Sequence, residues 1–258
     1  MFQIDGIQSN AADQNATNET RMDMETVQEV EFVTGGVDST VYGARSGFMN
    51  VVTKAGGNDF HGMLQFYYTG EKLQQVLPSD EQLAALGLVK PAFAIYSGEM
   101  SATLGGPIFK DKLWFFGSFK YNQNKSHVSY IPATIDGKFY GPYEPVQKQP
   151  IYFGKLTWQI SPNLTVFSML SHIGMEYPYF YTGTYLTGSA SATTRNSMYT
   201  SSNSLTWVMN PNTILDVRVG IHTQDWTGMY TPDAVPGPYF TDSYTGYAWG
   251  NRSMQSYT

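Results

Sequence analysis

The 258-residue sequence has no cysteine, no long apolar run and no excess of basic residues. Without cysteine the chain forms no disulfide, no thiolate metal site and no cysteine nucleophile. No apolar stretch approaches the roughly 18 residues that a membrane-spanning helix needs. The 21 acidic residues outnumber the 15 basic ones, which argues against a partner held through nucleic-acid phosphates.

Acidic and aromatic residues are unevenly distributed along the chain. Residues 1–59 hold nine acidic and three basic residues, whereas residues 60–258 hold twelve of each. Only four aromatic residues fall within the first 59 positions, against 35 in the remainder. We therefore predict two regions of different solvent exposure that meet near Asn58.

The acidic region contains short strand patterns. Val27 to Thr34 alternates apolar and charged residues, as in a half-buried strand, before two glycines interrupt it. A second β-branched run extends from Phe48 to Thr53, so the two predict a compact strand, turn and strand unit. Met1 to Ile7 is typical of a strand end closed by a turn at Asp5-Gly6.

Alternation with period two begins after Asp59 and continues through most of the chain. The most regular case has an apolar set on one face and a charged set on the other: Leu215, Val217, Val219 and Ile221 against Asp216, Arg218 and His222. Such a strand fits lipid on one side and water on the other. We count about seven such strands, with an eighth beginning near Tyr244.

The connections between these strands alternate in length. Short returns are predicted at 105–112, 161–163 and 210–212, and long excursions near 71–92, 123–150, 176–196 and from 227 onward. Outer-membrane barrels have this asymmetry, with short periplasmic turns and longer extracellular loops. A soluble β-sandwich has no reason to keep all its long loops at one end.

Two local features refine this picture. Ser79 and Gln82 have the spacing of a capping box, which predicts a helix of about two turns over 79–87. Trp114 and Phe116 interrupt the alternation near the start of their strand, where we expect an interfacial aromatic girdle.

Several ordered motifs together resemble TonB-dependent outer-membrane receptors, and in particular their Oar-like branch. The motifs are Glu29-Val30, Val41-Tyr42-Gly43, Arg45-Ser46-Gly47, Asn50-Val51-Val52-Thr53-Lys54, Asn58-Asp59-Phe60-His61-Gly62, Leu104-Gly105-Gly106-Pro107-Ile108 and Lys112-Leu113-Trp114-Phe115-Phe116. The resemblance covers almost the whole chain but only part of a full receptor.

The resemblance implies a mainly β fold with residues 1–58 as the C-terminal part of a plug domain. Residues 59–258 are then the N-terminal part of a transmembrane antiparallel β-barrel, with about seven or eight strands of the roughly 22 that enclose a plug. Such an incomplete sheet stays open, so we expect the strand near 60–69 not to pair with the last strand. The acidic segment should cover the polar, concave face of the sheet.

The function implied is energised uptake of a ligand, whether siderophore, peptide or glycan, across the outer membrane. The segment that contacts the TonB complex lies N-terminal to the retained half plug, so we expect it to be absent from this chain. The residues indicate no enzyme, no cofactor and no nucleic-acid partner. The four histidines are far apart in sequence, so no metal site is predicted.

Two groups of residues are candidates for contacts. The resemblance places Arg45 where plug meets barrel wall, although a solvated turn charge is an equal alternative. Aromatic residues in the extracellular loops are candidates for stacking on a ligand, or else for membrane anchoring and loop packing: Tyr177, Tyr179, Phe180, Tyr181, Tyr239 and Phe240.

Two other functions stay open. A non-transporting barrel or adhesin would bind a partner through its extracellular loops, with the acidic segment filling the lumen. A soluble, aromatic-rich carbohydrate-binding β-domain is the third interpretation, which the loop asymmetry disfavours.

Overall fold

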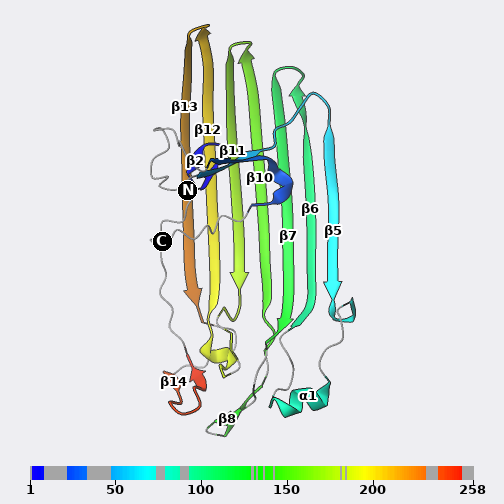
Figure 1. Ribbon diagram of the computed structural model, residues 1–258, viewed down its shortest axis with the longest axis vertical. Coiled ribbons are helices and arrows are strands. Elements are labelled where there is room, and N and C mark those ends of the chain that lie inside the picture. Colours follow the sequence, from blue (N-terminus) through cyan, green and yellow to red (C-terminus); the bar gives the residue numbers. More distant parts are fainter. Residues whose placement is uncertain are drawn as a thin grey trace.

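The main element of the computed structural model is a seven-stranded antiparallel sheet (Figure 1). Its strands are β5 (His61–Gly70), β6 (Phe93–Phe109), β7 (Leu113–His127), β10 (Val146–Ser161), β11 (Leu164–Tyr177), β12 (Thr193–Asn210) and β13 (Thr213–Met229). The structure describes residues 2–8, 22–33, 48–73, 79–87, 93–128, 131, 133–135, 137–141, 143–180, 182–183, 185–230 and 238–251. The spatial order β13-β12-β11-β10-β7-β6-β5 joins each strand to its neighbour in sequence.

The two faces of this long sheet differ as the alternation predicts. On β12 most inward side chains are small and polar, and Thr200, Ser202 and Ser204 are all buried. On β13 the outward side chains are apolar, and Val219 and Ile221 are 61% and 63% exposed. A face of exposed aliphatic side chains suits lipid, whereas the polar face suits a hydrated or covered lumen.

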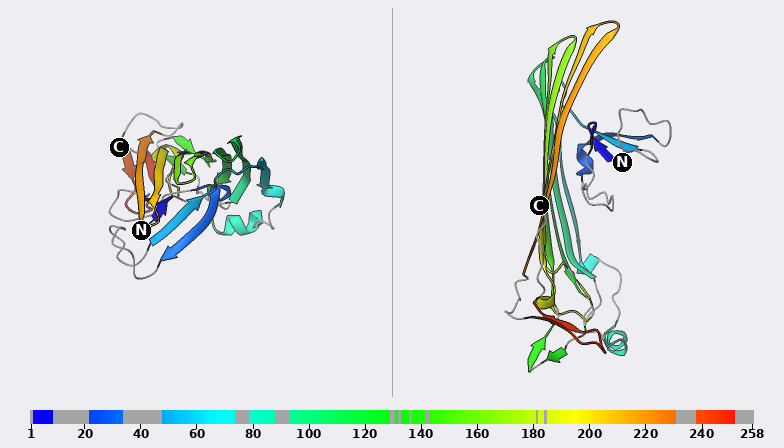
Figure 2. Two further views of the ribbon diagram at one scale, coloured as in Figure 1. Left: turned by 90° about the horizontal axis from the view of Figure 1, so that it is seen from above. Right: turned by 90° about the vertical axis from the view of Figure 1, so that its left-hand side faces the viewer.

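A second, four-stranded sheet lies on the polar face of the long sheet (Figure 2). This N-terminal sheet has the order β2-β1-β4-β3 and comprises β1 (Phe2–Ile4), β2 (Ile7–Gln8), β3 (Val27–Val33) and β4 (Phe48–Thr53), with a 3₁₀ turn at Met24–Thr26. The two sheets share one apolar core of Phe2, Ile4, Val51, Phe116, Phe153 and Met169. The predicted association of the two strands is confirmed, because β3 pairs antiparallel with β4, while the turn predicted between them lies outside the described residues.

The long connections gather at one end of the long sheet and the short turns at the other (Figure 1). The loop end carries the 3₁₀ turns Glu71–Leu73 and Gly188–Ala190, the helix α1 (Asp80–Ala85), and the strands β8 (Ala133–Ile135), β9 (Lys138–Tyr140), β14 (Tyr239–Thr241) and β15 (Ala248–Gly250). The predicted capping box is confirmed: Ser79 N donates to Gln82 Oε1 at 2.9 Å and Gln82 N to Ser79 Oγ at 3.3 Å.

The long sheet is open, as predicted. Strands β5 and β13 form its opposite edges and do not pair with each other. The eighth barrel strand predicted near Tyr244 is wrong, because a turn at 242–246 reverses the chain and β14 and β15 form a short hairpin instead. No helix among the described residues is long and apolar enough to cross a membrane.

Three local predictions need correction. The return predicted at 105–112 is shorter, because β6 continues to Phe109 and pairs with β7 through residue 109. Phe116 is not a girdle residue: it faces inward, 2% exposed, beneath the N-terminal sheet. Strand β3 is not half-buried, because it is an edge strand that projects from the long sheet, and Phe32 is 69% exposed.

Candidate functional site

A buried ion pair joins the N-terminal sheet to the long sheet. Lys155 Nζ of β10 lies 3.0 Å from Asp5 Oδ2 in the turn after β1, and the two side chains are 7% and 3% exposed. The ammonium also donates to Thr53 Oγ1 at 2.9 Å and to Thr53 O at 3.3 Å. All three ammonium hydrogens therefore have acceptors, which a buried charge requires.

The carboxylate of Asp5 is equally well satisfied. It accepts Thr53 N at 2.9 Å and the Thr53 hydroxyl at 2.5 Å. Asp5 adopts a positive φ of 47°, which suits a turn aspartate and aims its carboxylate back at β4. Ser202 Oγ of β12 donates to the Asp5 carbonyl at 3.3 Å. One turn of the N-terminal sheet thus contacts two strands of the long sheet.

A second polar contact lies at the 3₁₀ turn of the N-terminal region. Asp23 is 2% exposed, and its Oδ2 accepts the Ser118 hydroxyl at 2.6 Å. Lys120 Nζ lies 3.8 Å from Asp23 Oδ1 and 2.7 Å from Glu99 Oε1. These charged and polar groups come from the inward face of β6 and β7, so the N-terminal sheet sits on a polar wall at both contacts.

The linker between the two sheets is fastened to the first short turn. Asn58 Oδ1 accepts Asp111 N at 2.9 Å and Trp114 Nε1 at 2.8 Å, and Asn58 Nδ2 donates to Asp111 Oδ1 at 2.5 Å. A Cβ on Gly56 would lie 2.2 Å from Phe115 O, so only glycine allows this close approach. Trp114 shares the inward face of β7 with the buried Phe116, and its indole binds the linker, so its predicted place in a membrane girdle is wrong.

The predicted contact residue Arg45 lies outside the described residues. The contacts that the structure does describe use Asp5, Asp23 and Lys155, which the sequence patterns did not single out. The signal for Lys155 was available, because it is a charged residue at an inward position of β10, two residues after the buried Phe153. What it pairs with could not be inferred from strand alternation.

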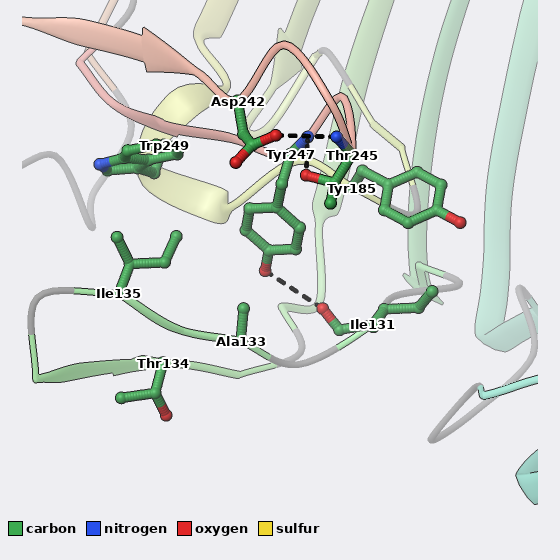
Figure 3. A pocket seen from close by; sticks show the side chains of 9 residues that line it. All are labelled: Ile131, Ala133, Thr134, Ile135, Tyr185, Asp242, Thr245, Tyr247 and Trp249. Carbon is green, nitrogen blue, oxygen red and sulfur yellow. Dashed lines mark hydrogen bonds between the residues drawn. The ribbon is translucent and has the colours of Figure 1, made fainter.

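At the opposite end, three long connections converge on a cavity of about 510 Å³ (Figure 3). Its described lining is Ile131, Ala133, Thr134, Ile135, Tyr185, Asp242, Thr245, Tyr247 and Trp249. The Tyr247 hydroxyl donates to Ile131 O at 3.1 Å, and Ala248 N donates to Tyr185 O at 2.8 Å. These bonds join the segments around 131, 185 and 247 into one unit.

None of the predicted ligand-binding aromatics that the structure describes belongs to the described lining of this cavity. Tyr179 packs on Tyr143 with ring centroids 4.9 Å apart, and Phe180 packs on Trp226 at 5.5 Å. Tyr177 contacts Phe180 at 6.1 Å. Tyr181 lies outside the described residues. These contacts show loop packing for the first cluster, and its role in ligand binding stays a prediction.

The second predicted pair is closer to the cavity. Tyr239 and Phe240 are 40% and 47% exposed, and Phe240 stacks on the cavity residue Trp249 with ring centroids 5.5 Å apart. Sequence reasoning missed Trp249, Tyr247 and Tyr185. Their separation in sequence gave no signal that they share a cavity.

Comparison with known proteins agrees with the open sheet and its loop asymmetry. Residues 52–139 match the family model for an outer membrane beta barrel domain. The chain is 33% identical over 128 residues to the TonB-dependent transporter Oar of Myxococcus xanthus. The aligned region covers 46% of this chain and 11% of Oar. The chain resembles the TonB-dependent receptors. The predicted likeness to the Oar-like branch and the predicted outer-membrane location are confirmed.

The fold of the chain is also similar to part of a solved receptor structure. A variant of the ferric enterobactin receptor of Pseudomonas aeruginosa, in complex with enterobactin, matches with a TM-score of 0.52 and 15% sequence identity. The match covers 88% of this chain and 33% of that receptor. The chain therefore spans about a tenth of the curated relative and a third of the solved receptor, and its sheet is one part of a barrel.

Proposed function

We propose that this chain contributes the C-terminal part of the plug and the first seven wall strands of a transporter for energised ligand uptake. In this proposal residues 1–58 belong to the plug and residues 59–258 to the barrel. The TonB complex acts through a segment outside this chain, and the ligand enters from the loop end. The chain itself carries out no covalent chemistry.

The observation that carries the proposal is the way the N-terminal sheet is seated. Among the residues that the structure describes, no strand of the N-terminal sheet pairs with the long sheet, and the contacts between the two sheets involve side chains and the linker. The ion pair of Asp5 and Lys155 and the Asp23 contacts can break and re-form without disturbing either ladder of backbone hydrogen bonds. A plug must move against its wall in this manner to open a path.

An adhesin that uses the N-terminal sheet only as a filler is the second candidate. Two observations favour transport over it: the similarity to a transporter, and the buried ion pair and polar contacts beside the shared apolar core, where a static filler would gain more stability from further apolar packing. The two candidates differ in whether the N-terminal sheet moves when the inner membrane is energised.

The proposed experiment places a cysteine under the N-terminal sheet. Ser202 is 0% exposed there, and Ser202→Cys is a small change. In a receptor without other cysteines, we expect periplasmic maleimide to label Ser202→Cys faster in energised cells than after loss of TonB or of the proton motive force. Equal labelling in all three conditions would refute movement of the plug.

Two matched positions control this measurement. Ser189 is 4% exposed within the loop end, so Ser189→Cys should stay unlabelled in every condition unless the receptor unfolds. Asn212 is exposed in a short turn, so Asn212→Cys should be labelled in every condition. Energy-dependent labelling at Ser189→Cys would indicate general loosening and not plug movement.

A further inference from the structure

The cavity at the loop end is built before any ligand arrives. Its walls come from the hairpin of β8 and β9, the segment around 185–190 and the hairpin of β14 and β15 (Figure 3). Tyr247 of the lining also belongs to a buried cluster with Val128 and Tyr143, and Trp249 packs against this cluster. Thr187 N donates to Ala248 O at 3.0 Å and closes the wall between two of the loops. A preformed site binds without first having to order its loops.

The cavity lining is suited to a flat ring. Six of the nine described lining residues are aliphatic or aromatic, and three of them carry rings: Tyr185, Tyr247 and Trp249. Phe240 stacks on Trp249, with the two rings 20° from parallel. The Tyr247 hydroxyl is already used by Ile131 O, so this residue contributes mainly its ring. A volume of about 510 Å³ lies within the range of small-molecule sites.

The only charge in the described lining is negative. Asp242 Oδ1 accepts the backbone N–H groups of Tyr244 and Thr245, each at 2.8 Å. Hydrogen bonds from Thr245 and Tyr244 lower the pKa of Asp242, which keeps it ionised. Lys138, a basic residue of the neighbouring hairpin, lies over the Tyr140 ring and is absent from the lining.

We infer that this cavity binds a ring-bearing group that carries no negative charge, as part of the ligand recognised by the loops. The inference rests on the proposed function, because it assigns the chemical class of ligand that the transporter takes. The rings supply contact area and stacking, while the ionised Asp242 disfavours anions and tolerates neutral or cationic groups.

The test uses three probes with one ring and different charges: 4-fluorobenzyl alcohol, 4-fluorobenzylamine and 4-fluorobenzoate. Binding to the purified receptor is measured by broadening of the fluorine resonance. We expect the alcohol and the amine to bind and the benzoate to bind about tenfold more weakly, as one nearby like charge predicts. Equal binding of benzoate and alcohol would overturn the inference.

Variants locate the binding and identify the charge. Trp249→Ala and Tyr185→Ala should each abolish the broadening by the alcohol, and Tyr185 is 49% exposed, so its loss leaves the fold intact. Trp207→Ala, at a position 40% exposed near the short-turn end of β12, is the matched control and should change nothing. Broadening that survives both cavity variants would place the binding elsewhere and refute the inference.

Asp242→Asn separates charge from shape. Asparagine keeps an oxygen for the N–H groups of Tyr244 and Thr245 but removes the negative charge. The benzoate should then bind within about threefold of the alcohol. All of these measurements use receptor without TonB or membrane energy, so their failure would refute the cavity assignment and leave the cysteine-labelling test of transport unaffected.

Discussion

Lys155 Nζ lies 3.0 Å from Asp5 Oδ2, although 150 residues separate them in sequence. Both side chains are buried and both are fully hydrogen-bonded, through Thr53 as the third member. The pair therefore fixes where the N-terminal sheet sits on the wall. Its geometry is the basis of the first prediction.

Lys155→Met should lower the free energy of opening of the N-terminal sheet by about 3–5 kcal/mol, because it leaves the Asp5 carboxylate buried without its counter-charge. Hydrogen exchange of the amides of β1 and β4 measures this loss. Lys148→Met, at an exposed position on the same strand, should have no effect. Adding Asp5→Asn to Lys155→Met should restore part of the protection, and a double variant worse than the single one would contradict the account.

Asn58→Ala should free the linker between the two sheets, because it removes the bonds to Asp111 and Trp114. The contact is exposed, so we expect its loss to lower the free energy that holds the linker in place by about 1 kcal/mol. Trypsin should cleave after Lys54 several times faster in this variant, which mass spectrometry of the fragments quantifies. Asn212→Ala, in an exposed turn far along the chain, is the control, and equal cleavage in both would refute the role of Asn58.

Gly56→Ala should destabilise the receptor, because the new methyl group would lie 2.2 Å from Phe115 O and 2.9 Å from Gly106 O. These are backbone atoms of paired strands, so the clash can be relieved only by distorting the ladder of hydrogen bonds. We expect this to lower the free energy of unfolding by about 1–3 kcal/mol. A Cβ on the adjacent Gly57 meets nothing within 4 Å, so Gly57→Ala should unfold like the parent protein. Thermal unfolding followed by gel mobility compares the two, and equal midpoints would contradict the prediction.

Tyr143 should make the loop end sensitive to alkali. Burial raises the pKa of Tyr143 to about 12, above its unfolded value of about 10. The folded state therefore favours the neutral phenol, and this stability is complete below pH 10 and is lost as the pH rises toward 12. Tyrosinate absorbance should show one late-titrating group that Tyr143→Phe removes. A titration identical in the variant would refute the assignment.

Much of the fold could be predicted from local sequence. The outward apolar set of β13, the capping box of Ser79 and Gln82, and the short turn at Pro162-Asn163 all depend on neighbours a few residues away. Period-two alternation assigns a side chain to one face or the other, and turn residues assign the connections. These local rules were sufficient for an antiparallel sheet with its long loops at one end, whereas the open edge of the sheet was predicted from the resemblance to receptors with many more strands.

The tertiary structure decided what covers each face. Alternation placed Lys155 on the inner face but could not pair it with Asp5, because the partner comes from another sheet. The interrupted alternation near the start of β7 predicts Phe116 at the membrane interface, yet the N-terminal sheet makes that part of the lumen an apolar core that contains Phe116. The loop cavity is likewise built from segments around 131, 185 and 247 that only folding brings together. Contacts between distant segments depend on how one sheet packs on another, and local periodicity in the sequence does not specify that packing.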